Sequence, residues 1–185
     1  MKILVFTEGT ILMHGLAKNL NREEIVRQSK EWGIRQEERN VVFTSASDNK
    51  VEVGSVGDYA SYIPNSNSVA KLTNWKNQDA TIFYLTSRRI KSEIEGIKNI
   101  LEKYRFPDSE NLFFRQQGED YKDVAERILP DVLIEDDCES IGGEKEMTHP
   151  HIRPDLKVKI KSIVVKEFGG IDDLANNTSD LVETK

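Results

Sequence analysis

Residues 3–10 of the chain read ILVFTEGT, an apolar run of four residues that is followed at once by polar residues and a glycine. A short continuous apolar run is typical of a strand that is buried on both faces, as the strands of parallel sheets are. The same character recurs at 82–85, 132–134 and 163–165 and, more weakly, at 112–114. The sequence therefore predicts a mostly parallel sheet that begins with the N-terminal residues.

Between these runs, apolar residues recur at the three- and four-residue spacing of a helix. The apolar stripes lie at 69–75, 90–101 and 121–128, and the last of them ends before Pro130. Strands that alternate with helices form right-handed strand–helix–strand units, which place helices on both faces of a sheet. We predict an α/β fold of the Rossmann-like type, a three-layer sandwich around a mostly parallel sheet.

A long segment after the first strand interrupts this alternation. It covers about residues 13–68 and contains a predicted helix, Arg22–Trp32, followed by polar sequence with many turn-forming residues. Residues 40–43 and 50–53 are predicted to pair as a small hairpin around residues 47–49. Open α/β sheets bind ligands at the carboxyl ends of their strands, where this insertion would lie. We interpret it as either a small cap or a surface excursion.

Composition limits what such a domain does. The chain has 185 residues, with 26 Lys and Arg, 32 Asp and Glu, and a formal net charge of −6. The acidic balance argues against a nucleic-acid partner, because the phosphate backbone attracts a cationic surface. No apolar run approaches the ~20 residues of a membrane helix, and the N-terminal run is too short for a signal peptide.

These features predict a cytoplasmic protein with no membrane partner. We expect one domain over residues 1–175 and a flexible polar tail at 176–185. The oligomeric state is open.

Polar residues with related chemistry follow three of the predicted strands, and they are Thr7, Glu8, Thr86, Ser87, Arg88, Asp136 and Asp137. Hydroxyls and backbone amides at a strand-to-helix turn can hold a phosphate, and Lys122 would add a point charge to it. Paired carboxylates supply the oxygen ligands that Mg²⁺ prefers. The sequence therefore predicts a site for Mg²⁺ and a small phosphorylated molecule, a nucleotide or another phosphometabolite.

In their order and placement these residues resemble the motifs of the haloacid-dehalogenase-like superfamily, most of whose members are phosphohydrolases on a Rossmann-like sheet. Residues 6–10 resemble the first motif, in which two aspartates one residue apart precede Gly-Thr. Residues 85–88 resemble the second motif, Lys122 the third and residues 135–137 the acidic fourth. The resemblance implies phosphate contacts from Thr86, Ser87, Arg88 and Lys122, and a metal held by Asp136, Asp137 and Glu8.

The first motif departs from the family pattern at the position of the aspartate that attacks phosphorus in the family. In the family, the first aspartate attacks phosphorus and the second acts as acid and base. If Gly9-Thr10 sets the register, Phe6 takes the first position and Glu8 the acid–base position. If the strand end sets it, Thr7 takes the first position. A phenyl ring cannot attack phosphorus and a threonine hydroxyl needs a general base, so neither register supplies the covalent mechanism.

Three functions remain open. In the first, the site binds Mg²⁺ and a phosphorylated small molecule with little or no turnover. In the second, a metal-activated water hydrolyses a phosphate monoester, and Glu8 or Glu135 accepts its proton. In the third, the sheet is a non-catalytic scaffold for a protein partner. The retained polar residues favour a ligand site and the missing nucleophile favours binding, so we rank ligand binding first.

Overall fold

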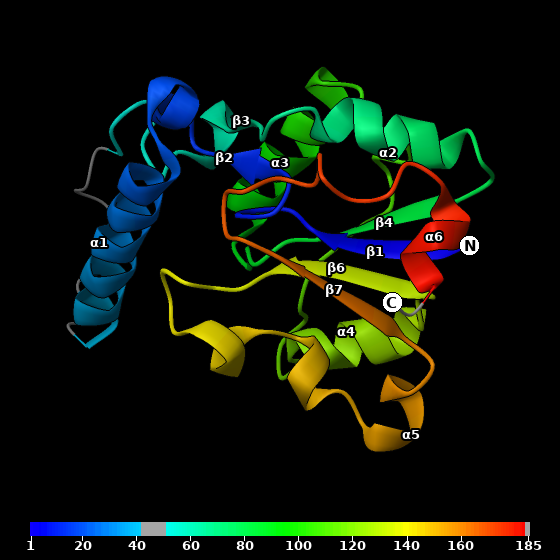
Figure 1. Ribbon diagram of the computed structural model, residues 1–185. Helices are drawn as coiled ribbons and strands as arrows, with labels where there is room; N and C mark the ends of the chain where they lie inside the picture. The colour runs from blue at the N-terminus through cyan, green and yellow to red at the C-terminus, as the bar shows by residue number, and fades with distance from the viewer. Residues whose placement is uncertain (42–50, 184–185) are drawn as a thin grey trace.

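The computed structural model describes residues 1–41 and 51–183, and a five-stranded sheet forms its centre (Figure 1). The strands lie in the order β5-β4-β1-β6-β7, and each neighbouring pair is parallel. Their bounds are Lys2–Phe6 for β1, Thr81–Leu85 for β4, Leu112–Phe113 for β5, Val132–Asp136 for β6 and Lys161–Val165 for β7. The predicted parallel sheet is confirmed, and each run predicted as a strand belongs to it.

Helices cover both faces of this sheet (Figure 1). Successive side chains of a strand point to opposite faces, so Ile3 and Val5 of β1 pack on one side and Leu4 on the other. The bounds of the covering helices are Ser68–Lys76 for α2 and Lys91–Lys103 for α3 on the first side, and Tyr121–Ile128 for α4 and Pro154–Lys157 for α5 on the second. The predicted three-layer α/β sandwich is therefore confirmed.

The segment between β1 and α2 is the predicted insertion. Two short strands, β2 (Leu12–Met13) and β3 (Ile63–Pro64), pair antiparallel at its two ends. The remaining elements are the short 3-10 helices η1 (Gly15–Asn19) and η2 (Tyr59–Ser61) and the long helix α1 (Arg22–Val41). Figure 1 shows α1 beyond the carboxyl end of β1, on the side of the sheet where a cap is expected.

Helix α1 is longer than the predicted Arg22–Trp32, because the residues up to Val41 include many Arg, Glu and Gln, which are strong helix formers. Residues 40–41 are helical and residues 51–53 form no strand, so the predicted hairpin is wrong there. Residues 42–50 of that hairpin lie outside the described residues. Despite the length of α1, no helix in the described part of the chain has the length and apolar character needed to cross a membrane.

The segment predicted as a flexible tail, 176–185, makes more contacts than its polar composition predicts. Residues Thr178–Val182 form the short helix α6, and its Leu181 is buried in the main core. Just before it, the Trp75 indole N–H donates a hydrogen bond of 3.0 Å to the carbonyl oxygen of Ala175. These partners on and near α2 hold the segment against the domain as far as it is described. Two further short 3-10 helices, η3 (Gly143–Glu146) and η4 (His149–His151), lie in the connection between β6 and β7.

Ile97 of α3 is fully buried in the core beside the sheet. We expect Ile97→Ala to lower the free energy of unfolding by about 2 to 5 kcal/mol, because it removes buried methyl groups and leaves a cavity. Val158, whose side chain is 84% exposed, provides the matched control. Val158→Ala should change the free energy by less than about 0.5 kcal/mol in the same urea denaturation experiment. Equal losses in both variants would contradict this description of the core.

Candidate functional site

A cavity of about 160 Å³ lies at the carboxyl edge of the sheet, between the strand ends and the insertion. We call it the Glu8 pocket. The sheet contributes Phe6, Glu8 and Asp136 to its lining, and the insertion contributes Trp32 and Tyr59. The insertion therefore forms one wall of the pocket, which favours the interpretation as a cap over a surface excursion.

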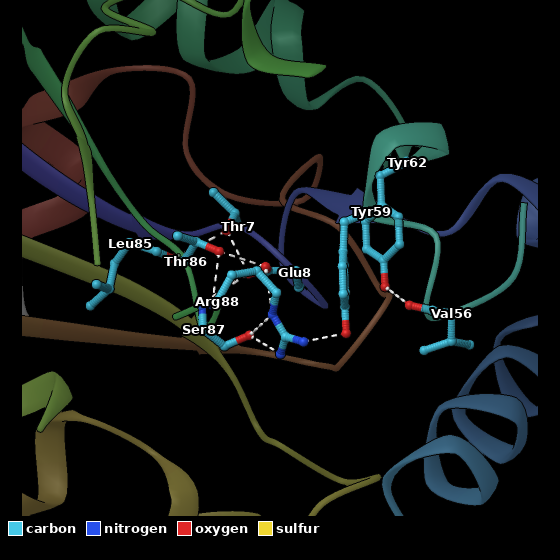
Figure 2. Close-up of polar contacts among 9 residues, drawn as sticks. All are labelled: Thr7, Glu8, Val56, Tyr59, Tyr62, Leu85, Thr86, Ser87 and Arg88. Carbon is cyan, nitrogen blue, oxygen red and sulfur yellow. Dashed lines mark hydrogen bonds and ion pairs between the residues drawn. The ribbon is translucent and has the colours of Figure 1, made fainter. Parts of the chain in front are cut away.

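The Glu8 carboxylate gathers the polar groups at the ends of two strands, as Figure 2 shows. Its Oε1 accepts a hydrogen bond of 2.6 Å from the Thr86 hydroxyl. Its Oε2 accepts one of 2.6 Å from the Thr7 hydroxyl and one of 3.2 Å from the Ser87 N–H. Arg88 Nε lies 3.4 Å from Oε1 and completes the set as an ion pair. Hydrogen bonds to a carboxylate are among the strong ones, so this side chain is firmly positioned.

The register of β1 and β4 brings these residues together. Phe6 pairs with Leu85, and the Thr7 N–H donates a 3.0 Å hydrogen bond to the Leu85 carbonyl, so the two strands end at the same level. Glu8 and Thr86 consequently leave the sheet side by side. The structure thus collects the predicted residues of the first and second motifs at one point.

Phe6 and Glu8 line the Glu8 pocket, whereas Thr7 does not. Thr7 is fully buried, and its hydroxyl lies 2.6 Å from Glu8 Oε2 and 3.2 Å from the Leu85 carbonyl oxygen. Side chains alternate across an extended segment, so residues 6 and 8 share one side and residue 7 takes the other. Of the two candidates for the first motif position, Phe6 therefore lines the pocket and Thr7 does not.

Arg88 connects the strand ends to the insertion (Figure 2). Its Nε and Nη2 lie 3.0 and 2.5 Å from the Ser87 hydroxyl oxygen, and its Nη1 donates to the Tyr59 hydroxyl. The guanidinium carbon also lies 4.4 Å from the centroid of the Tyr59 ring. Burial alone would lower the pKa of Arg88, but the charge of Glu8, followed by that of Tyr59, raises it. Arg88 therefore stays cationic in this half-buried position.

Asp136, at the end of β6, lines the same pocket. Its Oδ2 accepts a 2.9 Å hydrogen bond from the Thr10 hydroxyl, and its Oδ1 accepts one of 3.0 Å from the Cys138 N–H. Burial raises the pKa of Asp136 to about 6, although these hydrogen bonds oppose the shift. This carboxyl therefore holds its proton to a higher pH than an ordinary aspartate does.

Glu167, which the sequence interpretation missed, is a second buried acid in the pocket. It accepts hydrogen bonds of 2.6 Å from both the N–H and the hydroxyl of Ser140, and burial raises its pKa to about 7. Gly9 has φ +83°, and a Cβ there would lie 2.7 Å from Asp136 Oδ2 and 3.3 Å from Glu167 Cγ. Glycine at position 9 therefore lets both acids approach the backbone. The sequence signal that could have identified Glu167 is its position, as an acid two residues after the last predicted strand.

The predicted metal ligands Glu8, Asp136 and Asp137 do not converge. Asp137 lies outside the pocket, 2.9 Å from Lys166 Nζ, and accepts the Glu167 N–H at 3.0 Å. Burial alone would raise the pKa of Asp137, but these two hydrogen bonds lower it. Among the described residues, no group of three or more His, Cys, Asp or Glu side chains is placed to hold a metal ion.

Moreover, every carboxylate oxygen of these three acids already accepts a hydrogen bond from a protein donor. A divalent ion needs oxygens that face it together. As folded, the oxygens of the three residues are directed at separate protein donors, and the predicted three-carboxylate Mg²⁺ site is not assembled among the described residues.

Two further residues from the sequence interpretation lie elsewhere. Glu135 accepts hydrogen bonds of 2.6 and 3.0 Å from the N–H groups of Thr148 and His149, so it supports a loop rather than the pocket. Lys122, in the first turn of α4, lines a neighbouring cavity of about 170 Å³ instead of the Glu8 pocket. Ser87 lines the Glu8 pocket, so the predicted phosphate-binding lysine and serine line two adjacent cavities.

No protein-family model matches the sequence, and a comparison with curated proteins finds no match. Among solved structures, a similar one is a class C acid phosphatase from Bacillus anthracis with tungstate bound. The TM-score is 0.50 and the sequence identity 13%, over 91% of this chain and 68% of that chain. Class C acid phosphatases are members of the haloacid-dehalogenase-like superfamily, so this neighbour agrees with the predicted fold. At this identity the likeness concerns the fold alone.

The buried acid Glu167 predicts a pH dependence of stability. Because its pKa is raised from 4.5 to about 7, the folded protein keeps a proton there that the unfolded chain has lost. Its stabilising contribution is complete below the ordinary pKa of glutamate and is lost as the pH rises through about 7. We expect the free energy of unfolding to fall less between these limits in Glu167→Gln, which cannot titrate, than in the native protein.

Urea denaturation at a series of pH values measures this difference. Glu110→Gln, at an exposed position, is the control and should retain the native pH dependence. A Glu167→Gln curve parallel to the native one would contradict the raised pKa.

Proposed function

We propose that the protein binds a small phosphorylated molecule at the carboxyl edge of the sheet and does not hydrolyse it, either through a covalent aspartyl phosphate or through a metal-activated water. The observation that carries this proposal is the position of Phe6. It faces the pocket at the place where the resemblance expects a nucleophilic aspartate, and its ring packs edge-on against Tyr121 with the centroids 5.1 Å apart. A phenyl ring there supplies contact surface and no nucleophile.

Aromatic side chains from several elements support binding of a planar group. The Glu8 pocket is lined by Phe6, Trp32, Tyr59, Tyr62, Tyr121 and Phe168. Concave, mainly apolar cavities with a few fixed polar groups are the usual form of small-molecule sites. Flat rings favour ligands that stack on them, so we propose an aromatic or otherwise planar moiety. This lining also favours a ligand site over a scaffold that serves only a protein partner.

The phosphate part of the proposal rests on the cations at this edge. Arg88 lines the Glu8 pocket but pairs with Glu8, and Arg115 and Lys122 line the cavity beside it. Guanidinium and ammonium groups are the usual partners of phosphate oxygens. The structural neighbour was determined with tungstate, which is an oxyanion, and this supports oxyanion binding on the same kind of fold.

Two hydrolytic alternatives are less well supported by the geometry. Thr7 has a base within reach, because Glu8 Oε2 lies 2.6 Å from its hydroxyl, but Thr7 is fully buried outside the pocket. Hydrolysis by a metal-activated water, the second candidate function, needs carboxylate oxygens directed at a common ion. The oxygens of Glu8, Asp136 and Asp137 are directed at separate protein donors instead.

Phenyl phosphate combines a ring with a phosphate and tests the proposal directly. We expect it to raise the melting temperature and to release no phosphate above the level of a protein-free control. A ligand that binds only the folded state stabilises it by about 2.7 kcal/mol at about 100 times its Kd. Phenol is the matched ligand without phosphate and should produce a smaller shift. Steady phosphate release would overturn the proposal, and the absence of any shift with phenyl phosphate would favour the scaffold.

Mg²⁺ provides a second test of the same site. Because the predicted ligand oxygens are engaged by protein donors, we expect the affinity for phenyl phosphate to be the same within about twofold with Mg²⁺ or with EDTA. Isothermal titration calorimetry measures both conditions. A strong requirement for Mg²⁺ that disappears in Asp136→Asn would show that the acids rearrange around an ion, as the sequence predicts.

A further inference from the structure

The cavity that contains Lys122 lies directly beside the Glu8 pocket, because Tyr121 and Glu146 line both. We call it the Lys122 pocket. Its lining includes the cationic side chains of Arg115, Lys122 and Lys145. Two acids, Asp120 and Glu146, are the negative groups of the same lining. The cavity therefore has a surplus of positive charge next to an aromatic pocket.

The donors in the Glu8 pocket that would suit a phosphate already hold an anion. The Thr86 hydroxyl, the Ser87 N–H and the Arg88 guanidinium are all directed at the Glu8 carboxylate. A phosphate at that point would have to displace Glu8, and it would meet the repulsion of that carboxylate in a partly buried setting where charges interact strongly. A phosphorylated ligand therefore needs its cationic partners elsewhere.

Arg115 is a largely buried cation of the Lys122 pocket, with a side chain that is 17% exposed. Its guanidinium carbon lies 3.7 Å from the centroid of the Tyr121 ring, and the nearest acid, Asp120, is 3.8 Å away. Asp120 is itself engaged, since its carboxylate caps α4 and accepts the Tyr121 N–H at 2.7 Å. The positive charge of Arg115 is therefore only weakly compensated.

The cations of the Lys122 pocket have N–H groups or charges that are not fully paired with other described residues of the protein. In the described part of the chain, Arg115 Nε is buried without a hydrogen-bond partner. Over the same residues, neither Lys122 nor Lys145 forms an ion pair. Burial lowers the pKa of Arg115, and the charges of Arg89 and Arg88 add to this against an opposing effect of Tyr121 and Asp120. An anion in this cavity would compensate each of these unfavourable features.

We infer that the Lys122 pocket holds the phosphate of the ligand through Arg115, Lys122 and Lys145, while the planar group of the ligand lies past Tyr121 in the Glu8 pocket. This inference rests on the proposed function and narrows the ligand to a phosphate joined to an aromatic or similarly planar moiety. Arg115 offers paired N–H donors to two phosphate oxygens, and the lysines add point charges. The phosphate then lies away from Glu8 and Asp136, which accounts for binding without hydrolysis.

The test is isothermal titration calorimetry at low salt with inorganic phosphate and with phenyl phosphate as probes. The double variant Lys122→Ala/Lys145→Ala should weaken the binding of both probes by at least about tenfold, because it removes two charge-assisted contacts to the phosphate. The matched control is Lys98→Ala/Lys103→Ala on α3, which removes the same charge and should stay within about twofold of the native affinity. Arg115→Lys keeps the charge but loses the paired donors, and should weaken phenyl phosphate binding several-fold.

The outcomes separate this inference from the proposed function. If phenyl phosphate binds and its affinity survives in the double variant, the Lys122 pocket is not the phosphate site, while the proposed function stands. If phenyl phosphate does not bind the native protein, both are wrong. A weakening that the α3 control reproduces would reflect net charge alone and would also overturn the inference. Urea denaturation of each variant shows that the fold is retained.

Discussion

The hydrogen bonds between Glu8 and the end of β4 are the interaction on which the carboxyl edge depends. Glu8 receives the Thr86 hydroxyl and the Ser87 N–H, and it pairs with Arg88. Arg88 then reaches Tyr59 of the insertion, so one chain of polar contacts joins two neighbouring strands to the cap (Figure 2). That chain fixes the polar side of the pocket where the ends of β1 and β4 face the insertion. Such networks are stable when each member has its partners, as here.

The acidic residues of the pocket are less suited to bind a cation than their number predicts. The sequence places Glu8 and Asp136 at one sheet edge and therefore favours a cation as the first partner. In the structure, burial raises the pKa of Asp136 to about 6 and that of Glu167 to about 7, so both groups hold a proton to a higher pH than ordinary acids do. Their oxygens also accept hydrogen bonds from protein donors. Among the described residues, no three such side chains are grouped to hold a metal ion, so the acidic balance of the sequence is not gathered into one cluster.

The fold could be predicted from the sequence because continuous apolar runs and helical stripes are local signals, and the strand ends follow from them. The meeting of Glu8 with Thr86 was predictable for the same reason, since parallel neighbours share an edge. The direction of a single side chain could not be predicted, because a shift of one residue along a strand moves its side chain to the opposite face of the sheet. Glu135 and Asp136, which are neighbours in β6, contact different parts of the protein for this reason. The positions of the Lys122 and Glu167 side chains depend on the packing of the long connections between strands. A local sequence pattern does not specify that packing.

The phenyl ring of Phe6 and the hydrogen bonding of Glu8 are physically linked. A carboxylate at position 6 would compete with Glu8 for donors at the end of β4, and the ring of Phe6, which lines the pocket, does not. With a phenyl ring there, the buried Thr86 hydroxyl and the Ser87 N–H would lack an anionic acceptor, and leaving buried donors unsatisfied costs about 1–3 kcal/mol each. Glu8 supplies that acceptor at 2.6 and 3.2 Å. Phe6 therefore offers no nucleophile, and Glu8 occupies the donors at the end of β4 that a phosphate would otherwise use, which is the physical reason for proposing a phosphate site in the neighbouring cavity.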